Sequence, residues 1–478
     1  MSLKQKLASG FFWSFGQQIA NQVLGFALSI ILARLLLPSD FGIMGMIYVF
    51  FTIGNVLLEA GLSQSLIRTT DADTKDYSTI FYANILVSLG LYCILFIASP
   101  FIANFYNQPI LEKIIKIYGI SFFLTGLASV QNAILTKQLK FKVLMLMNLP
   151  ASLIGGVVGI FLATKNYGVW SLVFASLTTL FLICIQTWYF SKWKPELVFD
   201  KLKFKHHFNF GYKLMITNLL NAFFVNVYQV IFGKIYNPTI VGFYTRADSM
   251  RNISVYSIIN AVNKVTYPIL ATISENKENF SRVYIKIIKN IFLTVTPLLL
   301  FLIIMAQPIF IFLFTDKWLF AASYFQIILT SAILFSVNGY NANVISSIGR
   351  SDLVLKIEFI RIAFAVVVLV IAFQFGLKTL LWSQFILSII DYLIFQFYLK
   401  QLVQYPLVTR LKDIFQVLLM TGFSSGILFF CDHYFFKNHF ILIRLIEAFI
   451  LFVFVYFCQL FLFNFLNLKQ VYKLIKKA

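Results

Sequence analysis

Long apolar runs separated by short polar connections dominate this chain. We divide it into about fourteen runs of ~20 to 30 residues, each long enough to cross a ~30 Å hydrocarbon core at ~1.5 Å per residue. The runs cover residues 9–33, 41–62, 78–99, 114–135, 143–164, 169–190, 208–235, 240–273, 285–306, 320–347, 357–375, 379–399, 414–431 and 440–463. This pattern predicts an all-α polytopic membrane protein.

Lysine and arginine are distributed unevenly between alternate connections. Of the 39 basic residues, 27 lie on the side of the N-terminus and the even-numbered connections, and 9 lie on the opposite side. The remaining three, Arg246, Arg251 and Lys264, fall within the eighth run. Because cytoplasmic loops retain Lys and Arg, we expect both termini and the connection 192–213 to be cytoplasmic.

The composition agrees with a membrane protein and argues against two other classes. A chain that is 60% hydrophobic, 18% aromatic and only 12% charged is not an ordinary soluble domain. The net charge of +21 does not indicate nucleic-acid binding, since the basic residues sit in short connections rather than in a stripe interleaved with aromatics. Membrane lipids with anionic head groups are the expected partners of these residues.

An internal repeat divides the chain into halves. Residues 33–42 align without gaps with residues 233–242, and both copies contain Pro-x-x-x-Gly, in which we expect proline to end one helix and glycine to allow a tight return into the next. The longest polar connection, residues 191–205, lies between the copies. We therefore predict an N-terminal lobe of six helices, a C-terminal lobe of six helices, and two further helices with a basic cytoplasmic tail, over residues 1–200, 201–400 and 401–478 respectively.

Polar side chains form stripes on four of the predicted helices, at ~100° per residue. The first two helices carry Gln18, Asn21, Gln22, Asn55 and Glu59, and the repeat-related seventh and eighth helices carry Asn218, Asn221, Gln229, Asn260 and Asn263. Amides and carboxylates that face lipid tails cost several kcal/mol, so these stripes should face protein or water. For a single residue, hydrogen bonding between helices explains the position. The matching of four stripes favours a shared hydrated cavity.

Charges inside the predicted helices have two interpretations. Arg246, Arg251 and Lys264 could receive an anionic group of a substrate, or Arg246 and Asp248 could lie near the outer membrane surface and extend toward it. Asp248 can pair with Arg251 three residues later. Glu59 and Asp248 are candidates for coupling to an ion, because buried carboxylates can carry protons, although a structural hydrogen bond would equally explain Glu59.

Further charges lie in the eleventh and twelfth predicted helices. Glu358, Arg361 and Asp391 fit better as packing pairs than as parts of a substrate site.

Motifs for catalysis, metals and cofactors are absent or poor in the sequence. There is no HExxH pattern and no GxxxxGK[ST] phosphate loop. Asp71-Ala72-Asp73 has the form that sugar transferases use to hold a divalent metal, but it occupies a short connection with no soluble domain nearby. The four cysteines are isolated within apolar runs. We expect no catalytic residues, no metal and no cofactor.

Two motifs resemble a known family. Residues 33–42, Ala-Arg-Leu-Leu-Leu-Pro-Ser-Asp-Phe-Gly, and residues 59–68, Glu-Ala-Gly-Leu-Ser-Gln-Ser-Leu-Ile-Arg, resemble bacterial polysaccharide flippases of the O-antigen type, in the multidrug/oligosaccharidyl-lipid/polysaccharide exporter superfamily. The number of helices and the repeat extend the resemblance over essentially the whole chain. It implies two pseudo-symmetric six-helix lobes around a central cavity lined by helices one, two, seven and eight, with two additional C-terminal helices.

The resemblance also implies a function. Such proteins move an undecaprenyl-diphosphate-linked oligosaccharide, such as an O-antigen, capsule or exopolysaccharide repeat unit, from the cytoplasmic to the periplasmic leaflet of the inner membrane by alternating access. On this hypothesis the polar stripes meet sugar hydroxyls, and Arg246, Arg251 and Lys264 attract the diphosphate. Polysaccharide polymerases and glycosyltransferases are the implied protein partners.

Two alternatives remain from the sequence. A cation-coupled drug exporter of the same superfamily would generally use acidic residues within its lobes, and the first helix here has none. A membrane glycosyltransferase or polymerase should display a long extracytoplasmic loop with catalytic residues, whereas the connections on that side are short.

The related lipid II flippases carry arginines in the first two cavity helices, where this chain has Gln18, Asn21, Asn55 and Glu59, so a peptidoglycan precursor is disfavoured.

Overall fold

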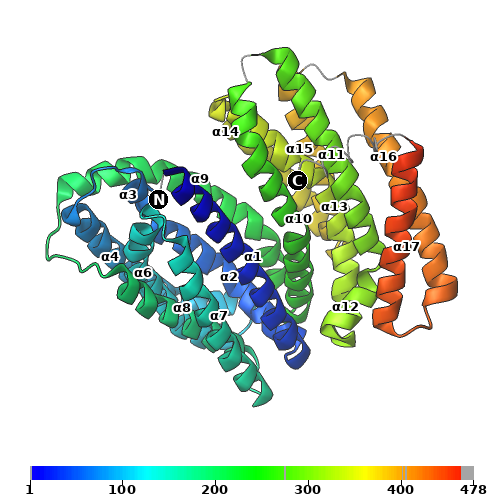
Figure 1. Ribbon diagram of the computed structural model, residues 1–478. Coiled ribbons are helices and arrows are strands. Elements are labelled where there is room, and N and C mark those ends of the chain that lie inside the picture. The colour runs from blue at the N-terminus through cyan, green and yellow to red at the C-terminus, as the bar shows by residue number, and fades with distance from the viewer. Residues whose placement is uncertain (1–2, 274–275, 401, 404–405, 464–478) are drawn as a thin grey trace. The chain divides into compact units, whose positions relative to one another are not determined.

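The computed structural model describes residues 3–273, 276–400, 402–403 and 406–463, and these residues form helices without any β-strand (Figure 1). The expected basic tail of residues 464–478 lies outside the described residues. The chain forms two compact units, residues 1–245 and 246–478, and each is described by itself. The prediction of an all-α protein is confirmed.

The first unit contains nine helices and the start of a tenth. They are α1 (Leu3–Leu35), α2 (Pro38–Glu59), α3 (Leu62–Arg68), α4 (Thr74–Tyr106), α5 (Ile110–Tyr118), α6 (Ile120–Lys137), α7 (Phe141–Thr164), α8 (Val169–Ser191), α9 (Lys201–Ile235) and α10 (Pro238–Thr272). Helix α7 packs against α1 and α8, α6 packs against α8 and α4, and α9 lies along α2, α3 and α4.

The second unit contains the rest of α10 and the remaining helices. They are α11 (Lys277–Ile304), α12 (Ala306–Phe314), the short 3-10 helix η1 (Asp316–Trp318), α13 (Leu319–Ser347), α14 (Ser351–Gln374), α15 (Leu377–Leu399), α16 (Leu407–Cys431), the π-helical turn η2 (Asp432–Phe436) and α17 (Ile441–Leu462). Helix α15 packs against α13 and α14, and α16 packs against α11 and α17.

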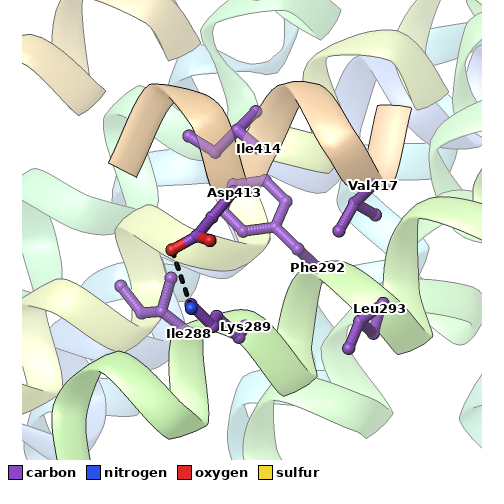
Figure 2. Close-up of a pocket in the computed structure, with 7 residues that line it drawn as sticks. All are labelled: Ile288, Lys289, Phe292, Leu293, Asp413, Ile414 and Val417. Atoms are coloured by element: carbon purple, nitrogen blue, oxygen red, sulfur yellow. Dashed lines mark ion pairs between the residues drawn. The ribbon is translucent and has the colours of Figure 1, made fainter. Parts of the chain in front are cut away.

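An ion pair helps to hold α16 against α11. Lys289 Nζ of α11 lies 2.9 Å from Asp413 of α16, at the edge of a cavity of about 10 Å³ that is otherwise mostly apolar (Figure 2). Farther along α11, the carbonyl oxygen of Leu293 accepts a hydrogen bond from the Tyr456 hydroxyl of α17 at 2.7 Å. The two C-terminal helices are therefore attached to α11 by polar contacts as well as by apolar packing.

Twelve helical segments in the described residues are long and apolar enough to cross a membrane. Of the fourteen predicted spans, those that correspond to α10 and α14 are not among the twelve. A multi-pass membrane protein is thus confirmed, and the count of fourteen stays a prediction. The predicted lobe boundaries at residues 200 and 400 describe the repeat and also stay a prediction, since the packing units divide the chain between residues 245 and 246.

The two Pro-x-x-x-Gly motifs meet each other inside the first unit. Pro38 and Pro238 begin α2 and α10, and Gly42 and Gly242 lie one turn into these helices. A Cβ atom on Gly42 would lie 1.6 Å from the carbonyl oxygen of Pro238, and one on Gly242 would lie 1.8 Å from that of Pro38. The expectation that these glycines form tight returns was wrong. They allow two repeat-related helices to pack backbone against backbone.

A second glycine pair lies where α2 ends. Ala60 and Gly61 have left-handed backbones, with φ of 41° and 68°, and this break separates α2 from α3. A Cβ on Gly61 would lie 2.7 Å from the backbone of Gly211 in α9. Glycine at position 61 therefore supplies both the left-handed turn and the close approach of α9.

Candidate functional site

The C-terminal end of α2, at Glu59, borders a pocket within the first unit. The pocket has a volume of about 220 Å³ and is bounded by the ends of α2 and α3, by one face of α6 and by α8. Its polar lining consists of Glu59, Ser63, Thr125, Ser129, Asn132 and Thr136, and its apolar lining includes Leu180 and Ile183 of α8. Sequence reasoning selected only Glu59 as a site residue from this set.

The α6 residues share one face of their helix. At ~100° per residue, positions 125, 129, 132 and 136 fall within a sector of about 60°. Helix α6 begins at Ile120 directly after Gly119, and α5 is a separate short helix, so the predicted single span 114–135 is broken at this glycine. The break was not predicted, and the polar face of α6 was missed because only the repeat-related helices were compared.

Most of the pocket's polar side chains have no partner in the part of the chain that the structure describes. Ser129 donates to the carbonyl oxygen of Gly126 at 2.9 Å and accepts from Asn84 at 2.7 Å. Glu59, by contrast, makes no side-chain hydrogen bond and no ion pair with any described residue, and the same holds for Ser63, Thr125, Asn132 and Thr136. Polar groups inside a helical bundle are satisfied by water or a ligand when protein does not satisfy them, so this pocket is a candidate for a hydrated or ligand-binding surface.

The other predicted stripe residues of the first unit occupy several environments. Asn55 and Gln18 are exposed, and Asn21 and Gln22 are half-buried on α1. On α9, Asn218 and Asn221 are exposed, while Gln229 is 7% exposed and its Oε1 has no hydrogen-bond partner among the described residues. Because α9 belongs to the first unit, these residues and the α2 stripe are parts of one packed body.

The predicted anion-binding residues on α10 have partners within the second unit. The Arg246 side chain is buried against the rings of Phe314 and Trp318, with its guanidinium carbon 4.9 Å and 5.1 Å from the ring centroids. Arg251 Nη2 lies 2.6 Å from a carboxylate oxygen of Asp248, which confirms that local pair.

The remaining α10 candidates lie farther along the helix. Lys264 and Asn260 are exposed, and Asn263 is half-buried with an Oδ1 for which the described residues offer no hydrogen-bond partner.

The charges of α14 and α15 form packing pairs, as the sequence predicted. Arg361 Nη1 lies 2.6 Å from Glu358 on the same helix, and Arg361 Nε lies 3.0 Å from Asp391 of α15. One guanidinium therefore links the two helices through two carboxylates.

Comparison with known proteins decides the family. A family model described as polysaccharide biosynthesis protein matches residues 31–323, which is more than half of the chain and includes all helices around the pocket. The chain belongs to this family. The resemblance inferred from residues 33–42 and 59–68 is thereby confirmed.

Relatives of this polysaccharide biosynthesis protein come from different bacteria. The teichuronic acid biosynthesis protein TuaB of Bacillus subtilis is 25% identical over 381 residues, which cover 78% of each chain. The lipopolysaccharide biosynthesis protein WzxC of Escherichia coli is 21% identical over 363 residues, which cover 76% of this chain and 74% of the relative.

A solved structure establishes the fold to which this family member belongs. A lipid II flippase, MurJ, in an inward closed conformation superposes with a TM-score of 0.73 at 16% sequence identity. The match covers 93% of this chain and 98% of that chain. At this identity the likeness concerns the fold alone.

One polar network of this family member was not predicted. At the start of α9, Lys203 Nζ lies 2.8 Å from a carboxylate oxygen of Asp73 and 2.8 Å from one of Asp76. His207 is fully buried between Asp76, at 3.2 Å from Nε2, and the Ser65 hydroxyl, at 2.8 Å from Nδ1. We call Ser65, Asp73, Asp76, Lys203 and His207 the α9 clamp.

The electrostatics of the α9 clamp follow from these contacts. The ammonium of Lys203 holds the pKa of Asp73 well below its usual range, and the carboxylates of Asp73 and Asp76 raise the pKa of Lys203. Burial lowers the pKa of His207, although Asp76 opposes this effect. The only sequence signal was the Asp73-x-x-Asp76 pattern, which forms the capping box of α4.

Proposed function

We propose that this protein flips an undecaprenyl-diphosphate-linked oligosaccharide from the cytoplasmic to the periplasmic leaflet of a bacterial inner membrane by alternating access. Support comes from membership in a polysaccharide biosynthesis family, from relatives named for teichuronic acid and lipopolysaccharide biosynthesis, and from the fold shared with a solved lipid II flippase. Those relatives serve different glycans, which favours a shared lipid carrier over one common sugar.

The observation that carries this proposal is the pocket beside Glu59. A membrane-spanning bundle that served only as an anchor would have no use for five polar side chains around 220 Å³ of space that have no partner among the described residues. In transporters, polar residues at such positions line substrate or ion pathways. We therefore assign contact with the oligosaccharide to the stripe residues, which are Gln18, Asn21, Gln22, Asn55, Glu59, Asn218, Asn221, Gln229, Asn260 and Asn263.

In this proposal the basic residues of α10 attract the diphosphate. Lys264 is exposed and is suited to a first contact with phosphate. Arg251 is held by Asp248 at 2.6 Å, so phosphate would exchange with that carboxylate. Arg246 would attract the diphosphate from its buried position rather than by direct contact, since aromatic rings cover its guanidinium. Glu59 and Asp248 are the candidates for ion coupling.

Topology and partners complete the proposal. Both termini and the connection 192–213 are assigned to the cytoplasm from the distribution of basic residues. Glycosyltransferases that build the lipid-linked unit, and the polymerase that consumes it, are the expected functional partners.

The decisive experiment uses the purified full chain in proteoliposomes. A fluorescent polyprenyl-diphosphate oligosaccharide is placed in both leaflets, and a membrane-impermeant quencher reports how fast the inner population appears outside. We expect exchange to be accelerated over protein-free vesicles without any change in the length of the glycan. No acceleration would reject the proposal, and a lengthened glycan would favour a polymerase. Efflux of cationic dyes by the same vesicles, without exchange of the lipid, would favour a drug exporter.

A further inference from the structure

We propose that the pocket beside Glu59 binds a single sugar ring of the head group and selects for rings without a negative charge. This inference rests on the proposed function and names the part of the substrate that this pocket recognises. Three features of the pocket support it: its size, the chemistry of its lining, and the lack of hydrogen-bond partners for most of its polar side chains among the described residues.

The volume fits one ring. About 220 Å³ holds roughly seven water molecules at ~30 Å³ each, which is the room that one pyranose with its hydroxyl groups needs. Pockets for larger ligands run from ~300 to 1,000 Å³, so neither a whole oligosaccharide nor a prenyl chain can be contained here. The remaining sugars of the head group must lie outside this pocket.

The lining fits a polyhydroxylated ring. The Asn132 amide offers both donors and an acceptor, Ser63, Thr125 and Thr136 offer hydroxyls, and the Glu59 carboxylate can accept hydrogen bonds from two adjacent sugar hydroxyls. Leu180 and Ile183 supply an apolar surface against which the ring's C–H groups can pack. The α6 groups share one face of a single helix, so their spacing is fixed before any ligand arrives.

The charge of the lining gives the selectivity. Glu59 is the one charged residue among those that line the pocket, and no Lys or Arg belongs to that set. A uronic acid or a phosphate in this pocket would place its negative charge beside the Glu59 carboxylate without a cation to compensate it. A neutral hexose meets no such repulsion, and an amino sugar with a free ammonium group would be attracted.

Binding is favoured because the polar groups gain partners. Glu59, Ser63, Thr125, Asn132 and Thr136 make no side-chain hydrogen bonds to described residues, so a sugar displaces only water and breaks no protein contact. Ser129, which is bonded to Asn84 and Gly126, is instead a structural member of the wall.

The test compares two synthetic cargoes in the proteoliposome exchange assay. Both are polyprenyl-diphosphate disaccharides, and they differ only in whether the terminal ring carries a hydroxymethyl or a carboxylate group. We expect the wild-type protein to flip the neutral cargo at least about tenfold faster, and Glu59→Gln to reduce this preference to about twofold or less by accelerating the acidic cargo. Asn132→Ala and Thr136→Val should slow the neutral cargo by about three- to tenfold each, as expected for one lost hydrogen bond.

Controls separate this inference from its alternatives. Asn104→Ala removes the same amide from an exposed site on α4 outside the pocket and should leave both rates unchanged. Thr136→Ser keeps the hydroxyl and should restore the rate that Thr136→Val loses.

Equal rates for the two cargoes in wild type would overturn the sugar site while leaving the flippase intact. Loss of both rates to the same extent in Glu59→Gln, with Asn132→Ala unaffected, would instead assign the pocket to a coupling cation and also overturn it. Failure of wild type to move either cargo would reject the proposed function itself.

Discussion

Removing the cation from the α9 clamp should make the start of α9 open more readily from the rest of the first unit. In Lys203→Met, Asp73 and Asp76 lose the ammonium that lies 2.8 Å from each of them, while the apolar length of the side chain is kept. The Asp76 side chain is only 9% exposed, so its contact with Lys203 resembles a charge-assisted hydrogen bond, worth about 1.5–3 kcal/mol. The Asp73 side chain is 53% exposed, and its pair is worth about 0.2–1 kcal/mol.

The two contacts share one ammonium and are not additive, so we take about 2 kcal/mol for the pair together. A local opening free energy lowered by that amount speeds amide exchange by about 30-fold. The assay is hydrogen–deuterium exchange of the full chain in nanodiscs, followed by mass spectrometry of peptides from α9. We expect the acceleration over residues 201–213 and little change over residues 214–235.

A matched control lies two residues away. Lys205 is exposed on the same helix and makes no ion pair or side-chain hydrogen bond to a described residue, so Lys205→Met should leave exchange unchanged. The reasoning is refuted if Lys203→Met changes exchange over residues 201–213 by less than threefold, or if both substitutions have the same effect. An equal acceleration along the whole of α9 would mean that the clamp does not act locally.

The pH dependence of the same exchange has a definite sign. Burial holds the pKa of His207 below 6.5, so the attached state of α9 binds fewer protons than the detached state. Attachment is therefore strongest above pH 6.5 and weakens as the pH falls below 6.5 toward the lowered pKa. Asp76, Lys203 and His206 are the charged or titratable groups around this ring, and Lys203 stays protonated throughout. His207→Gln should remove this pH dependence, whereas His206→Gln, at an exposed ring, should keep it.

Two further predictions concern packing. Gly42→Ala should abolish accumulation of folded protein in the membrane, because the new Cβ would lie 1.6 Å from the Pro238 carbonyl oxygen. Gly25→Ala is the control and should accumulate normally, since a Cβ at position 25 has nothing within 4 Å. Equal yields of the two variants would contradict the helix crossing. Asp413→Asn removes a half-exposed ion pair to Lys289 worth about 1 kcal/mol, so it should lower the thermal midpoint of the detergent-solubilised protein by a few degrees. An unaltered thermal midpoint would mean that apolar packing alone holds α16.

The sequence predicted the helices well because their signal is strong and local. Apolar runs of about 20 residues and the prolines at positions 38 and 238 place helices directly. The repeat at residues 33–42 and 233–242 was also visible in the sequence, but the structural role of its glycines was not. Whether a glycine allows a turn or a helix crossing depends on the backbone that lies opposite, and that information is absent from a local motif.

Partners that are distant in sequence limited the prediction of side-chain roles. Arg246 was expected either at the membrane surface or at an anion, and the structure places it against Phe314 and Trp318, about 70 residues later. His207 seemed to be an ordinary residue at a helix end, and its burial depends on Ser65 and Asp76 of other helices. The Arg251–Asp248 pair was predicted correctly because its spacing is local.

The structure also separates two explanations of intramembrane polar residues that the sequence left open. Hydrogen bonding between helices accounts for Asn84 with Ser129, at 2.7 Å, and for Tyr284 with Asn341, at 3.0 Å, since all four are buried and bonded. It does not account for Glu59, which borders a pocket large enough for several waters and has no protein partner among the described residues. Because an unsatisfied carboxylate in a dry bundle would cost several kcal/mol, the space beside Glu59 must be wet or filled by ligand. This contrast supports the proposed role of Glu59, and helical periodicity alone could not have supplied that evidence.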